Sequence, residues 1–205
     1  MAGRKKKRYT DGSDAAAIIG LNPYKTNIEL WEEKTGIKEA PDISDKPYVI
    51  YGTKMEPILR ESFQVKHPEY EIQHEENTII RHPVYPFLFA SLDGKLINKE
   101  TGEFGILEIK TKKFHADRQK EDWKEGVPYN YYLQVLHYLN VTGAKFAKLF
   151  AELTYADDYQ ATKTYDFDIY DEHIKNDMEY LLKKEIEFWK YVEDNKMPPL
   201  ILPEV

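Results

Sequence analysis

The stretch FLFASLDGKLINKETGEFGILEIKT, residues 87–111, decides the fold of this chain. Both of its ends have the composition of β-strands, and the NKETGE between them has the composition of a turn. The stretch therefore predicts an antiparallel hairpin of residues 87–97 with residues 104–111. In the second strand, a period of two residues places the charged Glu108 and Lys110 on one face and apolar neighbours on the other. An ordinary half-exposed strand has the same pattern, so the strand alone assigns no function.

Asp93 adds a second carboxylate to the hairpin. The midpoint between positions 93 and 108 lies at the centre of the turn, so a symmetric hairpin places Asp93 opposite Glu108, with Cβ atoms about 4.5–5.5 Å apart. Two carboxylates in that position repel each other unless a divalent cation lies between them. Oxygen ligands of this kind suit Mg²⁺, with Mn²⁺ as a substitute, and the spacing leaves open whether one or two ions are bound per site.

Lys110 follows Glu108 by two residues and adds a cation to the same face. Beside a metal ion, a lysine can orient or deprotonate an attacking water, or offset charge on a phosphoryl oxygen. Uncatalysed hydrolysis of phosphate esters is so slow that an enzyme must lower the barrier by on the order of 20 kcal/mol. The spacing of Asp93, Glu108 and Lys110 therefore indicates phosphodiester hydrolysis.

The rest of the sequence predicts helices before and after the strands. Helices are expected over residues 13–20, 26–36, 51–66, 128–141 and 171–194, and further strands over residues 70–73, 78–81, 145–154 and 160–169. Ser13 is expected to cap the first helix, and Pro57 to lie near the start of the third. This order of elements predicts one α/β (α+β) domain, residues 1–205, with a central mixed sheet flanked by helices.

The composition fits one folded domain and excludes several kinds of site. The chain has 205 residues, of which 41% are hydrophobic and 32% are charged, and this is enough apolar material for a core. The absence of cysteine excludes disulfide frameworks, zinc–thiolate sites, iron–sulfur clusters and cysteine nucleophiles. No apolar run approaches the about 18 residues of a membrane helix, and no signal peptide follows the basic start. We therefore expect a cytoplasmic protein.

Charge is distributed unevenly along the chain. The net charge of −7 argues against binding nucleic acid through excess positive charge alone. Positive charge is concentrated in a basic N-terminal arm, residues 1–8, and in a group after the hairpin: Lys110, Lys112, Lys113, Arg118, Lys120 and Lys124. Residues 171–194 are predicted to form an acidic C-terminal helix. Cations that line one cleft can bind a polyanion despite a negative total, and a solvated surface is the alternative interpretation.

Asp93, followed after fourteen residues by Glu108-Ile-Lys110, resembles the Asp…(Asp/Glu)-x-Lys signature of the PD-(D/E)XK nuclease superfamily. Four further blocks resemble the YqaJ-type viral recombinase family, relatives of the lambda exonuclease: GSDAAAIIGLNPY (12–24), ELWEEKTG (29–36), YGTKMEP (51–57) and YYLQVLHY (131–138). The resemblance runs from about residue 8 to residue 153 and implies a restriction-endonuclease-like core. The usual Pro-Asp of the signature is Leu92-Asp93 here.

The resemblance implies a catalytic role for five residues. Asp93 and Glu108 would hold the metal, with the backbone carbonyl of Ile109 as an extra ligand. Lys110 would serve the attacking water. Glu56 would be a supporting carboxylate, and its structural alternative is a solvated glutamate that the helix dipole favours.

The resemblance also implies a set of contacts to DNA or to a terminal 5′-phosphate: Arg8, Ser13, Ser91, Lys112, Gln134 and Tyr138. Ser13 lies at a helix N-terminus, where a hydroxyl and free N–H groups suit an anion, although it is equally suited to be only a cap. Gln134 and Tyr138 are four residues apart, so they share a helix face, and packing is their alternative role.

For the whole chain, the resemblance implies a Mg²⁺-dependent exonuclease that degrades one strand of double-stranded DNA ends, 5′ to 3′, for phage-type homologous recombination. It implies a homo-oligomer, with a trimeric ring favoured, a single-strand annealing recombinase as partner, and a phage or prophage origin in a bacterial host. One alternative is a structure-specific or restriction-like endonuclease on the same core. The other is a non-catalytic module that binds DNA ends or a partner, which the joint presence of Asp93, Glu108 and Lys110 argues against.

Overall fold

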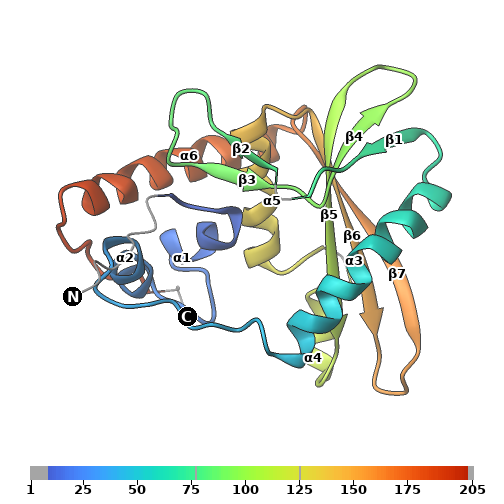
Figure 1. Ribbon diagram of the computed structural model, residues 1–205, viewed down its shortest axis with the longest axis horizontal. Helices are drawn as coiled ribbons and strands as arrows, with labels where there is room; N and C mark the ends of the chain where they lie inside the picture. The colour runs from blue at the N-terminus through green and yellow to red at the C-terminus, as the bar shows by residue number, and fades with distance from the viewer. Residues whose placement is uncertain (1–8, 77, 125, 203–205) are drawn as a thin grey trace.

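A computed structural model describes residues 9–76, 78–124 and 126–202, apart from the side chains of residues 117 and 118. A five-stranded sheet runs through the domain (Figure 1). Its strands, in spatial order, are β1 (Tyr70–Gln73), β4 (Gly94–Asn98), β5 (Phe104–Lys113), β6 (Phe146–Thr154) and β7 (Gln160–Asp168). β5 and β6 pair in parallel and the other neighbours pair antiparallel, so the predicted mixed sheet is confirmed.

The predicted hairpin is present, and it has the register that the sequence indicated. β4 and β5 pair antiparallel, with Gly94 opposite Leu107. Continued by one step, this register would bring Asp93 opposite Glu108, but β4 begins only at Gly94. The symmetric turn therefore gives the two strands the register that the spacing predicts.

The first strand of the hairpin is shorter than predicted, because residues 87–97 form two strands. β3 (Phe89–Ser91) leaves the main sheet and pairs with β2 (Ile79–Arg81). β4 begins only after Leu92 and Asp93. The break releases Asp93 from the ladder, so that its side chain is free to bond to β5.

One face of the sheet is covered by α3 (Pro47–Lys66) (Figure 1). Leu59 and Phe63 of this helix pack on Leu107 and Phe150 of the sheet. The helix begins earlier than the predicted residue 51, because Pro47 has a fixed φ and lacks an N–H, both of which suit a first turn. Pro57 consequently lies inside the helix, not near its start as predicted.

The other face carries the larger core. It is built by α5 (Tyr129–Thr142), α6 (Glu172–Glu193) and the short α1 (Ala15–Ile18). Val135 and Leu136 of α5 and Leu149 of β6 are fully buried there. A short helix that the sequence did not predict, α4 (Asp117–Glu121), follows β5.

The second helix, α2 (Asn27–Thr35), matches its prediction at both ends. Thr26 and Glu29 form a reciprocal capping box at its start, and Gly36 ends it with φ of 78°. Glycine adopts this left-handed conformation without the strain that a Cβ would cause.

The first helix differs from its prediction. Asp11, and not Ser13, caps a 3₁₀ turn, η1 (Gly12–Asp14), that leads into α1. The Asp11 side chain accepts a hydrogen bond from the N–H of Gly12, and Asp14 bonds back to the N–H of Asp11 at 3.1 Å. Aspartate caps a helix as well as serine does, and this reciprocal pair decides between them. Ser13 lies exposed within the turn.

No helix in the part of the chain that the structure describes is both long enough and apolar enough to cross a membrane.

Candidate active site

Asp93 is fixed in place by two hydrogen bonds. Its Oδ2 atom accepts from the main-chain N–H of Ile109 at 2.7 Å, and its carbonyl oxygen accepts from Nε of Arg60 at 2.7 Å. The carboxylate therefore lies against β5, beside the strand position of Glu108. Burial raises the pKa of Asp93 above its usual value, with Lys110 acting in the opposite direction.

Glu108 is 2% exposed and is only half satisfied. Its Oε1 atom accepts a hydrogen bond from Nζ of Lys110 at 2.5 Å, whereas Oε2 is buried and has no hydrogen-bond partner. Burial, and then the charge of Asp93, raise the pKa of Glu108 to about 8. A buried carboxylate oxygen without a partner is costly, and a bound cation removes that cost.

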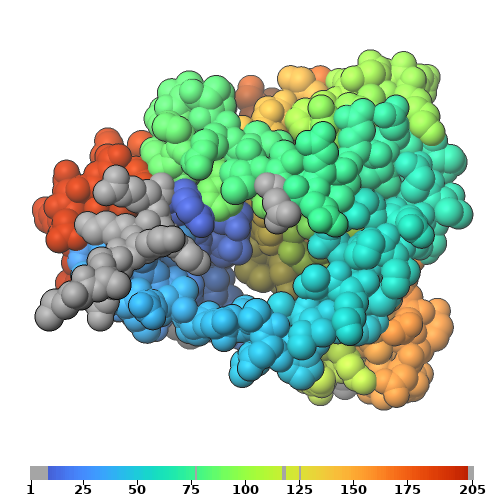
Figure 2. All heavy atoms as spheres, in the orientation of Figure 1, coloured from blue at the N-terminus to red at the C-terminus, as the bar shows by residue number. Residues whose placement is uncertain are grey.

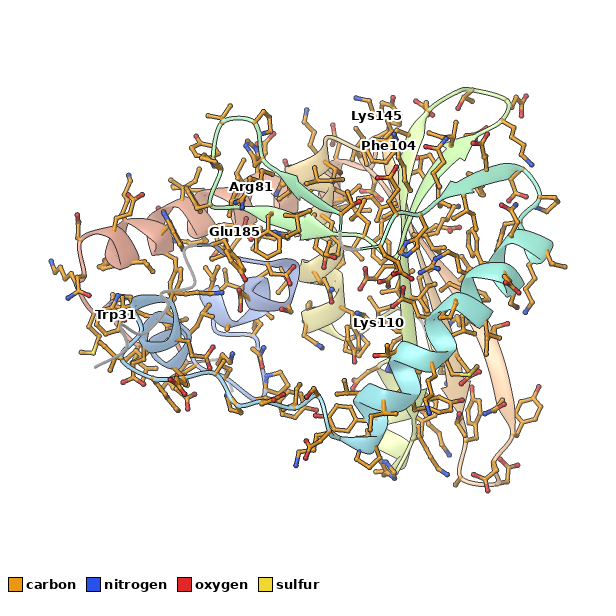
Figure 3. The ribbon with its side chains drawn as sticks, in the orientation of Figure 1. Trp31, Arg81, Phe104, Lys110, Lys145 and Glu185 are labelled. Atoms are coloured by element: carbon orange, nitrogen blue, oxygen red, sulfur yellow. The ribbon has the colours of Figure 1, made fainter. Side chains whose placement is uncertain are left out.

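Lys110 lies near the middle of the molecule, beside α3 (Figure 3). Its side chain is 20% exposed, and Nζ lies 5.3 Å from the centre of the Tyr131 ring. Burial alone would lower the pKa of Lys110, but Glu108 and Asp93 raise it above its usual range. Lys110 is therefore held as an ammonium ion that still reaches solvent.

The donors present fit a small hard cation that retains water molecules. In the described ranges, no three or more His, Cys, Asp or Glu side chains form a complete metal site. Asp93 and Glu108 supply two carboxylates. The N–H and C=O of one strand residue point to the same side, so the carbonyl of Ile109 points the same way as its N–H, towards Asp93. Mg²⁺ commonly takes one or two carboxylates and fills its other positions with water and phosphate oxygens.

Glu56 belongs to the same cleft. A cavity of about 270 Å³ is lined by α3 on one side and by Asp93, Ile109 and Lys110 on the other, and Glu56 lies on the α3 side. Its carboxylate pairs with Arg60, one helical turn further on. Burial, and then Asp93, raise the pKa of Glu56.

Arg60 is a residue of this site that the sequence analysis missed. It connects two carboxylate residues, through the side chain of Glu56 and the main chain of Asp93. The four-residue spacing of Glu56 and Arg60 on a predicted helix was the available signal, because side chains at that spacing meet.

Gln134 and Tyr138 are joined on one face of α5, as predicted. Nε2 of Gln134 donates to the Tyr138 hydroxyl at 3.1 Å, and this hydroxyl donates to Oδ1 of Asp11 at 3.2 Å. Burial, and then the charge of Glu108, raise the pKa of Tyr138 well above its usual value. Asp11, which the sequence analysis did not single out, is thus connected to this pair, and its pKa is raised by burial.

The residues predicted to hold a terminal phosphate are less closely assembled. Ser13 and Ser91 are both exposed, and no hydrogen bond joins them in the described structure. Thr10 pairs with Leu88, which brings the start of the chain beside β3. Lys112 is partly exposed near the end of β5. Arg8 lies outside the described residues.

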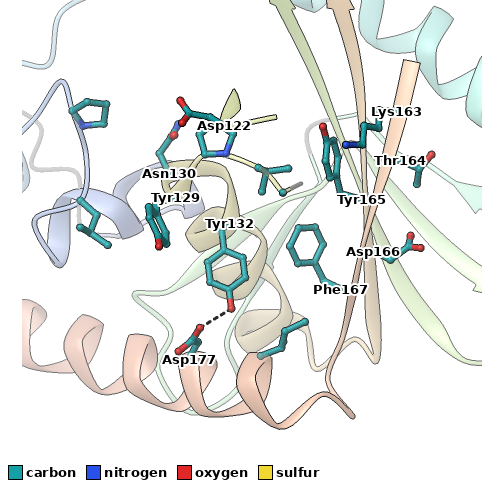
Figure 4. A pocket seen from close by; sticks show the side chains of 16 residues that line it. Asp122, Tyr129, Asn130, Tyr132, Lys163, Thr164, Tyr165, Asp166, Phe167 and Asp177 are labelled. Atoms are coloured by element: carbon teal, nitrogen blue, oxygen red, sulfur yellow. Dashed lines mark hydrogen bonds between the residues drawn. The ribbon is translucent and has the colours of Figure 1, made fainter. Parts of the chain in front are cut away.

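A larger cavity lies elsewhere in the domain (Figure 4). It measures about 1020 Å³ and is bounded by α5, β7 and α6, with Tyr132 donating to Asp177 at 2.7 Å in its wall. None of the hairpin carboxylates lines it. Asp93 and Lys110 line the smaller cleft instead, so the larger volume does not mark the residues with the chemistry.

Comparison with solved structures places the fold among exonucleases. An alkaline exonuclease from Laribacter hongkongensis, LHK-Exo, is 18% identical, with a TM-score of 0.58 over 93% of this chain and 94% of that chain. A phage-related exonuclease from Haemophilus somnus 129PT is 13% identical, with a TM-score of 0.54 over 91% of this chain and 96% of that chain. At these identities the likeness shows the fold alone, a central mixed sheet flanked by helices as the sequence predicts.

Comparison with sequences gives the family. The protein YqaJ of Bacillus subtilis (strain 168) is 33% identical over 186 residues, which cover 90% of this chain. The chain spans about half the length of that relative, 53%. The family model of the YqaJ-like viral recombinase domain matches residues 3–145, a range that contains Glu56, Asp93, Glu108 and Lys110. The chain is thus a member of the family of YqaJ-like viral recombinase domains.

Proposed function

We propose that this domain is a Mg²⁺-dependent deoxyribonuclease that hydrolyses phosphodiester bonds at the hairpin carboxylates. The observation that carries the proposal is the unpartnered, buried Oε2 of Glu108, in a carboxyl group that lies beside Asp93 and is paired with Lys110. A merely structural sheet has no use for two carboxylates side by side with one oxygen left unsatisfied. The exonuclease names of the structural neighbours agree with this chemistry.

Each residue of the cleft has a distinct part in the proposed reaction. Asp93, Glu108 and the Ile109 carbonyl would hold the ion, which when bound supplies Lewis-acid stabilisation of the phosphoryl oxygens. Lys110 is kept protonated by the two carboxylates. It donates a hydrogen bond either to the attacking water, which it orients, or to a phosphoryl oxygen, whose charge it stabilises. Glu56, aligned by Arg60, accepts hydrogen bonds from water on the α3 side.

We further propose that the enzyme acts on double-stranded DNA ends and degrades one strand 5′ to 3′, for phage-type recombination. Family membership supports this assignment, since the family is described as viral recombinases. Gln134 and Tyr138, which are joined on one face of α5, are the proposed contacts to the substrate, and Ser13, Ser91, Arg8 and Lys112 are the proposed phosphate contacts.

One assay separates this function from its rival. Linear duplexes labelled at their ends and closed circular duplexes are incubated with the protein, with Mg²⁺ and with EDTA. An exonuclease degrades only the linear DNA, and only with Mg²⁺. Nicking of the circles at a similar rate would assign a structure-specific or restriction-like endonuclease, and no cleavage of either DNA would assign a non-catalytic DNA-end or partner-binding module.

The assembly and partners follow from the same proposal. A single domain of net charge −7 attracts duplex DNA weakly, and a closed homo-oligomer, such as a trimeric ring, retains DNA without strong contacts. We propose such a ring, a single-strand annealing recombinase that takes over the exposed strand, and activity in the cytoplasm of a bacterial host. Light scattering at micromolar concentration tests the assembly, for which a monomeric mass is the contrary result.

A further inference from the structure

Residues 37–46, here called the strap, join two bodies of the domain, one built on α2 and the other on α3 (Figure 1). On one side, α2 packs into a core with α1 and α6, where Nε1 of Trp31 donates to the carbonyl of Tyr191 at 3.1 Å. On the other side, α3 packs on the sheet. The strap connects the end of α2 to the start of α3, so its two ends are anchored on different bodies.

The strap is bonded to α2 at its start, where the N–H groups of Ile37 and Lys38 donate to the carbonyl of Glu32, and its middle is exposed. Residues 37–39 and 41–46 are exposed, and residue 40 is partly exposed. In the described structure, the hydrogen bonds of residues 39–45 stay within the strap: Ser44 donates its N–H to Asp42 at 2.9 Å, and Lys46 donates its N–H to the carbonyl of Ile43 at 3.0 Å. These local turns, with Pro41 and Pro47, give it a preferred shape without attaching it to a surface.

The strap spans an open space beside the proposed active site. Figure 2 shows the molecule hollowed between the strap, α3 and α5. Tyr48, which follows the strap in the first turn of α3, lines the cleft together with Asp93 and Lys110. The strap therefore runs from the edge of the hollow to the α3 side of this cleft.

The dimensions of this opening favour one strand of nucleic acid. The cleft beside Lys110 has about 270 Å³, the low end of the volume that a small-molecule site encloses, which excludes a duplex. Ten extended residues reach at most about 33–36 Å, so the strap is long enough to arch over a single strand. It carries two lysines and three acidic residues, so it does not attract phosphates and acts as a barrier.

We propose that one DNA strand reaches the active site by passing beneath the strap, end first, and is then held topologically. This inference rests on the proposed nuclease function and adds a reason for end dependence: a strand without a free end cannot be threaded. It also retains the strand within a single subunit, independently of any ring.

The test uses a strap that can be cut. The recognition sequence of a specific protease is inserted between Asp42 and Ile43, or between Ala40 and Pro41 if the first variant does not fold. Ca²⁺ replaces Mg²⁺ to prevent hydrolysis, and the protein is loaded on a single-stranded oligonucleotide that carries streptavidin at its 3′ end and biotin at its 5′ end. Streptavidin is then added to close the 5′ end.

The readout is the protein that stays bound at high salt, where the Debye length falls to about 3 Å and charge contacts are lost. We expect the closed complex to persist, cutting of the strap to release the protein, and streptavidin added before the protein to prevent loading. The parent protein treated with protease is the control. Dissociation of the closed complex at high salt, or retention after the strap is cut, would overturn the inference.

Failure of the inference and failure of the proposed function have different signatures. The end-labelled linear duplex with Mg²⁺ reports hydrolysis, which does not depend on the locking experiment. A protein that hydrolyses the DNA but dissociates when both ends are closed lacks the threading step and keeps the nuclease function. A protein that hydrolyses nothing lacks the proposed function.

Discussion

Lys110 and Glu108 form an ion pair of 2.5 Å in which the second oxygen of the glutamate stays buried without a partner. The pair uses one oxygen and leaves the other directed into the protein, beside Asp93. This half-satisfied carboxylate is the structural reason to assign a cation to the hairpin, since partly satisfied buried groups are expensive.

The first prediction concerns Lys110. The variant Lys110→Ala should lose hydrolysis by a factor of about 10²–10³, the usual cost of one stabilising donor, because the lysine acts on the water or phosphate. Its fold should persist. Lys113→Ala is the matched control, since Lys113 is on the same strand but pairs with the exposed Asp158. Steady-state rates on labelled linear duplex measure both, and full activity in Lys110→Ala would remove the lysine from the mechanism.

The second prediction concerns stability and pH without metal. The folded pKa of Glu108, about 8, lies above its ordinary value of 4.5. The unfolded chain therefore releases this proton first as pH rises, so the free energy of unfolding should fall between about pH 4.5 and pH 8. Glu108→Gln should flatten this fall. Urea unfolding in EDTA at several pH values measures the free energy of unfolding of both proteins. An equal dependence on pH in both would contradict the assigned pKa.

The third prediction concerns a buried pair that ties α6 to the strand before Asp93. Nδ1 of His137 lies 2.5 Å from Oε1 of Glu185, and Nε2 donates to the carbonyl of Phe89 at 2.8 Å. Both side chains are fully buried. Removing one member of such a pair leaves the other charge uncompensated, so Glu185→Gln should lower the free energy of unfolding by about 3–5 kcal/mol at pH 6. Urea denaturation measures this.

The pH dependence of that effect has a defined direction. Burial alone would lower the pKa of His137, but Glu185 raises it above 6.5. The stability that the pair contributes is therefore complete below pH 6.5 and is lost as pH rises through the folded pKa. Glu187→Gln, which breaks the exposed pair with Lys184, should cost far less than Glu185→Gln at any pH, because solvent screens an exposed pair. Equal costs for the two variants would refute the buried charged pair.

The fourth prediction concerns the end of the DNA. A linear duplex with a 5′-phosphate should be degraded faster than the same duplex with a 5′-hydroxyl, because Ser13, Arg8 and Ser91 are the proposed phosphate contacts. Ser13→Ala should reduce the difference without abolishing hydrolysis. The measurement is the rate of degradation of each duplex by the parent protein and by the variant. A parent protein indifferent to the phosphate would show that no such pocket operates.

The sequence predicts the parts of this structure that depend on local pattern. The register of β4 with β5 follows from a symmetric turn, and α2 follows from its capping box and its terminal glycine. Both are determined by residues within one turn or one hairpin, so no distant contact overrides them.

Other parts depend on contacts between distant segments. The strand predicted over residues 87–97 breaks before Asp93 because β3 leaves the main sheet and pairs with β2. The apolar pattern of the sequence does not indicate this change of partner. Asp11 is part of the site through Tyr138, which is 127 residues away in the chain. Arg60 bonds to the main-chain carbonyl of Asp93. Every residue has such a carbonyl, so the sequence gives no signal for this bond.

Binding of Mn²⁺ to the hairpin carboxylates tests the central claim most directly. Free Mn²⁺ is measured by electron paramagnetic resonance during titration of the parent protein, Glu108→Gln and Lys110→Ala. The parent and Lys110→Ala should bind Mn²⁺ at one or two sites, Mg²⁺ should displace it, and Glu108→Gln should lose the binding. Equal binding by the parent and Glu108→Gln, or none by the parent, would show that the orphaned glutamate oxygen does not hold a metal.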